Sequence, residues 1–276
     1  MSALEAIILG IVQGITEFAP VSSSGHLILV PWLLGWEKLG DAALDKTFDV
    51  ALHFGTFVGV VVYFWPRIVR LVGGVARLVA RRRIEGDEDR RLALMVMVST
   101  VPAAVAGFAG DRVIEERLGG AHLVAAMLIG FGVLLWAADR AGRKARPLAQ
   151  YGWREAVGIG LAQALALVPG VSRSGVTMTA ALGLGSERQA AAYYSFLISI
   201  PIIGGAVAAK ALAVTQTGLP AGSVVPFAAG TFSAAVSGYL CIRFLLGYLQ
   251  TKSLAPFAWY RIVLGAALLA LALYRA

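Results

Sequence analysis

Long apolar stretches separated by short polar segments run along the whole chain and predict membrane-spanning helices. A transmembrane helix needs about 20 mostly apolar residues. Six stretches reach or approach that length, at approximately 49–65, 92–110, 121–138, 188–210, 223–246 and 254–274. The pattern predicts an all-α polytopic membrane protein.

Two further apolar stretches are interrupted near their middles. The stretch 3–35 breaks at 19–25, and the stretch 154–186 breaks at 169–175. Both breaks are rich in Pro, Gly and Ser, which punctuate helices. Irregular backbone at membrane depth survives only where protein buries it or where it lines a cavity. We therefore predict two re-entrant helix–loop–helix hairpins whose loops are candidate binding sites.

The two hairpins are copies of each other. Residues 5–25 align with 155–175 without a gap, at a constant offset of 150 and with 8 of 21 positions identical. The identical pairs are Glu5/Glu155, Ala6/Ala156, Gly10/Gly160, Gln13/Gln163, Val21/Val171, Ser22/Ser172, Ser24/Ser174 and Gly25/Gly175. Three spans follow each hairpin. We predict one membrane domain, 1–276, built from repeats 1–140 and 150–276, with about ten helices and six full spans.

Composition supports a membrane protein. Of 276 residues 58% are hydrophobic and 14% charged, and mean hydropathy is +0.76, whereas a soluble domain has about 25% charged residues. These values exclude a soluble globule and a disordered chain. The formal charge of +8 does not indicate nucleic-acid binding, because the basic residues lie in short polar segments between spans. Cys241 is the single cysteine and has no intrachain partner.

The charge pattern also predicts an orientation. Arg-rich segments 66–91 and 139–154 are separated by two spans, and the positive-inside rule places both in the cytoplasm. A re-entrant hairpin returns to the side that it entered, so each half crosses three times and the second half is inverted. The hairpin loops should then meet near the midplane, with the loop 111–120 and both termini outside. No Lys or Arg precedes Lys38, so a cleavable signal is not expected.

The first hairpin carries groups suited to acid–base chemistry. Glu17 ends the first arm, and Gln13 lies four residues earlier on the same helix face. The loop then adds three hydroxyls, a flexible backbone and an imidazole: Ser22, Ser23, Ser24, Gly25 and His26. Backbone N–H groups at such a turn can bind an anion. The alternatives are a buried polar pair that fixes helix packing and serines that only cap the second arm.

The second hairpin carries one cation, Arg173, in an apolar sequence. Arg binds phosphate bidentately, and Ser172, Ser174 and Thr177 add hydroxyls. The alternative is a structural ion pair with Glu17. The repeat aligns Arg173 with Ser23, so the charged groups are divided between two copies that together predict one asymmetric anion site.

Other candidates are weaker. Asp49 and His53 are four residues apart at the start of a span, where they would join the mouth of the site or form an interfacial polar pair. The sequence contains no cluster of Cys and His residues. Mg²⁺ would still fit between Glu17 and substrate phosphates, because Mg²⁺ uses one or two carboxylates together with phosphate oxygens.

These motifs resemble those of the undecaprenyl diphosphate phosphatase family, the bacitracin-resistance phosphatases. The resemblance rests on Gln13-Gly-Ile-Thr-Glu17-Phe, Pro20-Val-Ser-Ser-Ser-Gly-His26 and Pro169-Gly-Val-Ser-Arg-Ser-Gly-Val-Thr177, and it covers essentially the whole chain. The first motif has Gln13 where the family also has Glu, which argues against a scheme that needs two carboxylates for the metal.

The resemblance implies hydrolysis of undecaprenyl diphosphate to the monophosphate and inorganic phosphate, which recycles the carrier lipid for peptidoglycan synthesis and confers bacitracin resistance. It implies a divalent cation, Mg²⁺ or Ca²⁺, held by Glu17 and Gln13, and an active site on the extracytoplasmic side of the bacterial inner (plasma) membrane. Glu17, Ser23, His26 and Arg173 are the expected catalytic residues. The attacking group is Ser23, His26 or water, and we favour Ser23 because it aligns with Arg173.

Two other functions fit the sequence less well. Acid-phosphatase-like lipid phosphatases need a His and an Asp after their Ser-Arg, and neither occurs between Arg173 and Leu184. A polyprenyl-phosphate flippase or secondary transporter fits inverted repeats, but it has less need of Glu, His and Ser beside the Arg. The partners expected are the polyprenyl diphosphate substrate, membrane lipid and, as an open alternative, a second copy of the chain.

Overall fold

The computed structural model is all-helical over the residues that it describes, 1–36, 42–81, 88–117, 120–217 and 223–275. Ten α-helices and one 3₁₀ helix occur there: α1 (Ala3–Phe18), α2 (Ser23–Leu34), α3 (Ala42–Arg81), α4 (Glu88–Arg117), α5 (Ala121–Ala141), η1 (Leu148–Gln150), α6 (Trp153–Leu165), α7 (Arg173–Gly183), α8 (Arg188–Thr217), α9 (Val224–Tyr248) and α10 (Ala255–Arg275). The prediction of an all-α chain is confirmed.

Six helices in this part of the chain are long and apolar enough to span a membrane. They contain Leu44–Ala76, Glu88–Gly110, Ala121–Ala141, Arg188–Lys210, Val224–Tyr248 and Ala255–Leu273. Each contains one of the predicted spans, or nearly all of it. The protein is therefore a multi-pass membrane protein.

Some predicted boundaries were wrong. Much of the polar segment 66–91 is helical, because α3 continues to Arg81 and α4 begins at Glu88. The predicted loop 111–120 is mostly the last two turns of α4. Polarity ends a membrane span without ending a helix, because backbone hydrogen bonds continue wherever the residues are good helix formers.

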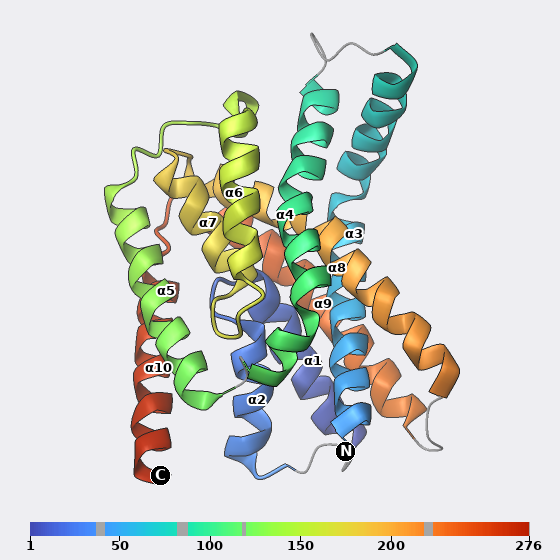
Figure 1. The fold of residues 1–276 in the computed structure, drawn as a ribbon, viewed down its shortest axis with the longest axis vertical. Coiled ribbons are helices and arrows are strands. Elements are labelled where there is room, and N and C mark those ends of the chain that lie inside the picture. The colour runs from blue at the N-terminus through green and yellow to red at the C-terminus, as the bar shows by residue number, and fades with distance from the viewer. Residues whose placement is uncertain (37–41, 82–87, 118–119, 218–222, 276) are drawn as a thin grey trace.

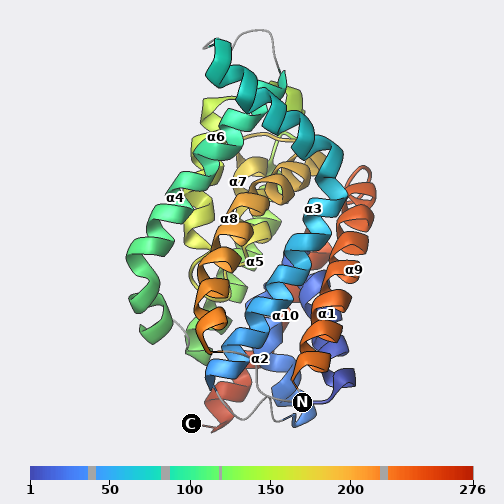
Figure 2. The ribbon, with the colours of Figure 1, turned by 90° about the vertical axis from the view of Figure 1, so that its right-hand side faces the viewer.

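The hairpins occupy opposite halves of the molecule. Figure 1 shows α1 and α2 in the lower half and α6 and α7 in the upper half, with the two connecting loops facing each other between them. The N-terminal end of α1 and the C-terminal end of α10 both lie at the lower end, and Figure 2 shows the same from the side. The C-terminal end of α3 and the connection that follows α5 lie at the upper end.

Helix α9 packs closely between α1 and α3, and glycines make this possible. A Cβ on Gly14 of α1 would lie 2.0 Å from Ser237 Oγ and 2.6 Å from the backbone N of Gly238. A Cβ on Gly55 of α3 would lie 2.3 Å from the carbonyl oxygen of Thr231. Small residues let membrane helices approach this closely. The end of α1, which carries Glu17, is therefore fixed by its contact with α9.

Identical residues of the two copies have matching contacts. Gly10 of α1 meets α9, and Gly160 of α6 meets the backbone of Ser99 on α4. Glu5 accepts the backbone N–H of Ser2 at the start of α1, and Glu155 accepts that of Gly152 at the start of α6. These contacts agree with a duplicated scaffold, while the inverted relation of the two repeats stays a prediction.

Gly14→Val should destabilise the protein, because the added methyl groups would force α1 away from α9. Overpacking of this kind costs about 1–3 kcal/mol, so the thermal unfolding temperature in detergent should fall. Gly247→Ala is the matched control, since nothing lies within 4 Å of a Cβ at Gly247. An unfolding temperature for Gly14→Val equal to that of the control would contradict this packing.

Candidate active site

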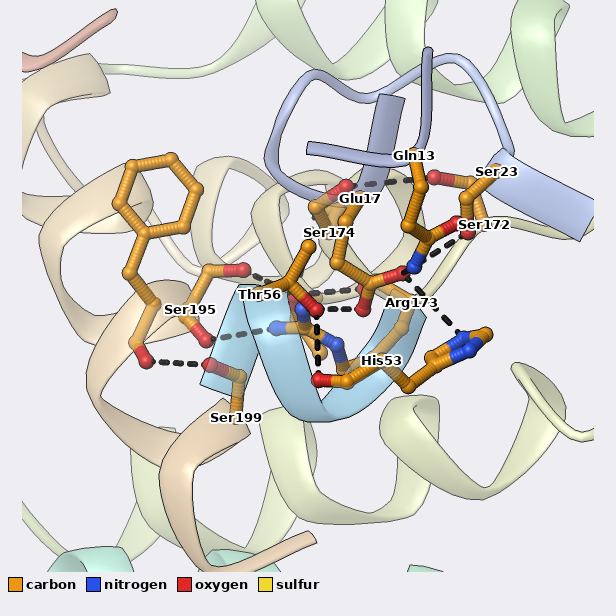
Figure 3. A network of polar contacts seen from close by, with 12 residues as sticks. Gln13, Glu17, Ser23, His53, Thr56, Ser172, Arg173, Ser174, Ser195 and Ser199 are labelled. Atoms are coloured by element: carbon orange, nitrogen blue, oxygen red, sulfur yellow. Dashed lines mark hydrogen bonds and ion pairs between the residues drawn. The ribbon is translucent and has the colours of Figure 1, made fainter. Parts of the chain in front are cut away.

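Glu17 is the point at which the two hairpins meet. Its Oε1 accepts a hydrogen bond from Arg173 Nη2 on α7 at 2.9 Å, and its Oε2 accepts one from Ser23 Oγ on α2 at 2.8 Å. Gln13 Nε2 donates to the same Oε2 at 3.2 Å. Figure 3 shows these groups converging on the carboxylate. A cation, a carboxylate and a hydroxyl from three helices are thus assembled in one buried network.

Corresponding serines turn the chain into the second arm of each hairpin. Ser22 and Ser172 have φ of 75° and 69°, a left-handed conformation that is uncommon for residues other than glycine. The helices begin directly afterwards, so Ser23 and Arg173 are their first residues. The predicted breaks 19–25 and 169–175 were therefore too long at their C-terminal ends. The turn directs both first residues toward Glu17.

The capping alternative holds for one loop and fails for the other. Ser172 Oγ accepts the backbone N–H of Gly175 at 3.2 Å and so caps α7. Ser22 makes no side-chain cap with α2, and its Oγ instead lies 3.2 Å from Ser24 Oγ. The first backbone N–H groups of α2 therefore lack a side-chain cap from Ser22, which leaves them suited to an anion.

Helix α8 and the hydroxyls of α7 hold Arg173 in position. Arg173 Nη1 donates to the carbonyl oxygen of Ser195 at 3.1 Å, and Thr177 Oγ1 lies 2.7 Å from Ser195 Oγ. Ser174 Oγ donates across to the carbonyl oxygen of Ala19 in the first loop at 3.1 Å. The ion pair with Glu17, which was the alternative to a phosphate clamp, is present. The two contacts of the guanidinium use two of the five N–H donors of Arg173. The remaining donors can bind a phosphate.

His53 also reaches Glu17, from helix α3. Its Nε2 lies 3.8 Å from Glu17 Oε2, and its Nδ1 lies 2.7 Å from the carbonyl oxygen of Asp49. A carbonyl oxygen can only accept, so Nδ1 carries a proton and Nε2 faces the carboxylate. The Asp49 side chain lines the same cavity.

His26 lies apart from this network among the residues that the structure describes. Its Nδ1 lies 2.7 Å from the carbonyl oxygen of Ser22, and its Nε2 lies 2.7 Å from Tyr260 Oη on α10. The two rings stack with centroids 5.6 Å apart. Gly25 lines a different, mostly apolar groove. Tyr260 could not be recognised from the sequence, because aromatic residues are ordinary in a span.

A cavity of about 360 Å³ opens onto Glu17 and Arg173. Its other polar lining residues are Lys46, Asp49, His53, Gln163 and Lys210, and its apolar wall is formed by Val50, Ala103, Ala166, Leu167, Ile202, Ile203, Ala206 and Val207. Sequence reasoning missed Lys46 and Lys210. Lys46 could have been found, because it lies three residues before Asp49 and seven before His53, on one helix face.

A divalent cation can be tested against the oxygen atoms present. Gln13 is fully buried, and its Oε1 has no hydrogen-bond partner in the structure. Its Nε2 donates to Glu17, so this free oxygen lies close to the carboxylate. Amide and carboxylate oxygens suit Mg²⁺ and Ca²⁺. The described residues contain no group of three or more His, Cys, Asp or Glu that could hold a metal. The oxygen set thus fits a cation that takes most of its ligands from substrate and water.

Arg261 joins the backbones of the two loops from α10. Its Nη2 donates to the carbonyl oxygens of Gly170 at 3.0 Å and Val171 at 2.8 Å, and its Nη1 donates to that of Pro20 at 3.4 Å. The side chain is completely buried. Sequence reasoning missed Arg261, because a single Arg in a terminal span has no motif around it.

Arg261→Met should separate the loops, because three buried carbonyl oxygens would lose their donors. A hydrogen bond to a charged group contributes about 1.5–3 kcal/mol, so both the unfolding temperature and the catalytic activity should fall. Arg154→Met, at an exposed position on α6, should change neither. Full activity and unchanged stability in Arg261→Met would contradict this function of Arg261.

Comparison with known proteins agrees with the geometry. Residues 6–267 match the family model described as bacitracin resistance protein BacA. The chain is 48% identical to the undecaprenyl-diphosphatase of Pelobacter propionicus over 99% of this chain and 98% of the relative. It is 48% identical to that of Geobacter sulfurreducens over 98% of each chain, and 45% identical to that of Rubrobacter xylanophilus over 99% of each. The chain belongs to the bacitracin resistance protein BacA family.

Proposed function

We propose that this protein is an integral-membrane phosphatase that hydrolyses undecaprenyl diphosphate to undecaprenyl phosphate and inorganic phosphate. The hydrogen bond from Ser23 Oγ to Glu17 Oε2, with Arg173 on the other carboxylate oxygen, carries the proposal. The names of the relatives, undecaprenyl-diphosphatase, support it. The reaction recycles a carrier lipid for peptidoglycan synthesis and accounts for bacitracin resistance.

Ser23 is the proposed nucleophile and Glu17 its general base. A nucleophile and its base must lie within hydrogen-bond reach, as these two do at 2.8 Å. Ser23 Oγ forms a bond to the terminal phosphorus while its proton passes to Glu17. The bond from that phosphorus to the bridging oxygen breaks, and the lipid monophosphate leaves. Water then cleaves the phosphoserine ester and releases inorganic phosphate.

Arg173 is the proposed clamp for the terminal phosphate. Its free donors match phosphate oxygens, and the charge that develops on those oxygens during transfer needs fixed cations nearby. Ser172, Ser174 and Thr177 hold the start of α7 so that the guanidinium stays in place. Ser22, Ser24 and Gly25 belong to the other loop, where the first backbone N–H groups of α2 have no side-chain cap from Ser22. These N–H groups are the proposed second contact for the diphosphate.

Glu17 and Gln13 would hold the divalent cation, Mg²⁺ or Ca²⁺, through Glu17 oxygens and the unpartnered Gln13 Oε1. When bound, such a cation supplies positive charge to phosphate oxygens. The homodimer stays a prediction.

His26 is the alternative nucleophile, and its surroundings make it the weaker one. Its Nδ1 is directed at the Ser22 carbonyl, and its Nε2 is engaged with Tyr260. We propose instead that His26 and Tyr260 brace the start of α2, which positions Ser23.

Phosphate release from a polyprenyl diphosphate by purified protein tests the function. Wild type should release phosphate with Mg²⁺ or Ca²⁺ and stop in EDTA. Ser23→Ala should lower kcat by about a thousandfold or more, as losses of catalytic nucleophiles do, while Ser253→Ala, outside the cavity, is the matched control.

Three outcomes would contradict parts of the proposal. Activity retained by Ser23→Ala and lost by His26→Ala would transfer the attack to His26. Activity retained in EDTA would show that the reaction does not need a divalent cation. The flippase would be favoured if the folded wild-type protein did not hydrolyse the substrate but moved a lipid phosphate across vesicle membranes, and if Ser23→Ala did so equally well.

We also propose that the protein lies in the bacterial inner membrane with both termini and the site opening on the extracytoplasmic side. The Arg-rich segments support this orientation through the positive-inside rule. The start of α1 and the end of α10 lie at the same end of the molecule, opposite the C-terminal end of α3 and the connection that follows α5 (Figure 1).

Cysteine labelling in intact cells tests the orientation. Cys241 is the single cysteine and is buried, so the background should be low. Ser2→Cys should react with a membrane-impermeant maleimide in intact cells, whereas Lys144→Cys should react only after the cells are opened. The reverse pattern would contradict the orientation.

A further inference from the structure

Two lysines from different helices line the outer part of the active-site cavity. Lys46 lies on α3 and Lys210 on α8, and both are exposed. Lys46 belongs to a helix face with Asp49, Val50 and His53, which all line the cavity. This spacing of three, one and three residues keeps them on one side of a helix.

The face of α8 across the cavity has the same spacing. Ile203, Ala206, Val207 and Lys210 line the cavity from this helix, and Figure 2 shows α3 and α8 side by side along the molecule. Lys46 lies near the start of α3 and Lys210 near the end of α8. Figure 2 shows both of these helix ends toward the end of the molecule at which α1 begins.

Distance separates these lysines from the reacting groups. Lys46 is seven residues from His53, or about 10 Å along a helix axis, and His53 Nε2 is 3.8 Å from Glu17 Oε2. A phosphate held by Lys46 would therefore lie outward from the Glu17–Arg173 pair. Lys210 is likewise seven residues beyond Ile203 on α8.

The charges that line this cavity favour an anion. Lys46, Arg173 and Lys210 face it as cations, and Glu17 and Asp49 as carboxylates. Glu17 is already paired with Arg173. In its outer part the cavity lining carries two lysines and one carboxylate, Asp49.

Lysines at the ends of spans commonly extend along apolar surface to reach water. That ordinary use does not explain why lysines from two helices line one cavity that leads to a catalytic carboxylate and an arginine. A lysine ammonium is a compact point charge with three donors and suits phosphate.

We propose that Lys46 and Lys210 form an outer phosphate site, which binds a phosphate group on its way between solvent and the Glu17–Arg173 pair. This inference rests on the proposed phosphatase function, because it assigns a substrate or product group to the same cavity. The phosphate belongs either to the incoming lipid diphosphate or to the outgoing inorganic phosphate. In both cases the site raises the local concentration of the anion and leaves the chemical step unchanged.

Binding and kinetics of Lys46→Gln, Lys210→Gln and the double variant test this inference. Gln keeps a polar side chain at exposed positions, so folding should be preserved. Lys252→Gln removes the same charge at an exposed position outside the cavity and is the matched control. Equilibrium binding of a short-chain polyprenyl diphosphate and of inorganic phosphate is measured in neutral detergent, beside kcat and KM.

An incoming-lipid site predicts that the double variant binds the lipid diphosphate about tenfold more weakly, the size of one lost charged hydrogen bond. KM should rise by a similar factor while kcat stays within about twofold. A product site predicts the same weakening for inorganic phosphate, seen as a higher inhibition constant. Either difference from wild type should shrink at about 1 M salt, because salt screens exposed charges.

Binding and KM equal to those of Lys252→Gln, for both the lipid and inorganic phosphate, would overturn the outer site. A fall in kcat with unchanged KM and binding would also overturn it, because the lysines would then act on the chemical step. Binding is measured without turnover. A wild-type protein that binds the lipid but does not hydrolyse it would refute the phosphatase function, and the binding of the lysine variants would still test the outer phosphate site.

Discussion

The ion pair between Glu17 and Arg173 is the contact on which the rest of this structure depends. An arginine and a glutamate at membrane depth are costly unless each finds a partner, and here each partner comes from the other hairpin. Neither loop can bury its charge alone. The pair therefore gives a physical reason why the two hairpins meet, and it leaves Arg173 with further donors in the lining of a cavity.

The surrounding scaffold serves mainly to hold that contact. Glycines allow α1 to pack closely against the backbone of α9. Arg261 binds carbonyl oxygens of both loops. Ser22 and Ser172 keep left-handed backbones that other packing must support. Such residues make the site rigid, which electrostatic stabilisation of a transferring phosphate requires.

Much of this arrangement could be predicted from the sequence, because its main signals are local. Apolar length predicts the six spans, and the duplicated Gln13–Gly25 and Gln163–Gly175 segments predict the two hairpins and their joint site. Contacts between distant residues leave no local signal in the sequence. Arg261 and Tyr260 contact loops more than 80 residues away. Lys210 can be recognised as a cavity residue only when the packing of α8 against α3 is known. His26, four residues from Ser22, was expected beside Glu17, but its helix face directs it to Tyr260.

A double-mutant cycle on Glu17 and Arg173, measured as kcat/KM for a polyprenyl diphosphate, tests the central claim most directly. The single variants Glu17→Gln and Arg173→Gln are compared with the variant that carries both changes. Residues that act as one unit are strongly non-additive, so the double variant should be hardly less active than the worse single variant. Losses that multiply would mean that Glu17 and Arg173 act independently, and would contradict a single site assembled from both hairpins.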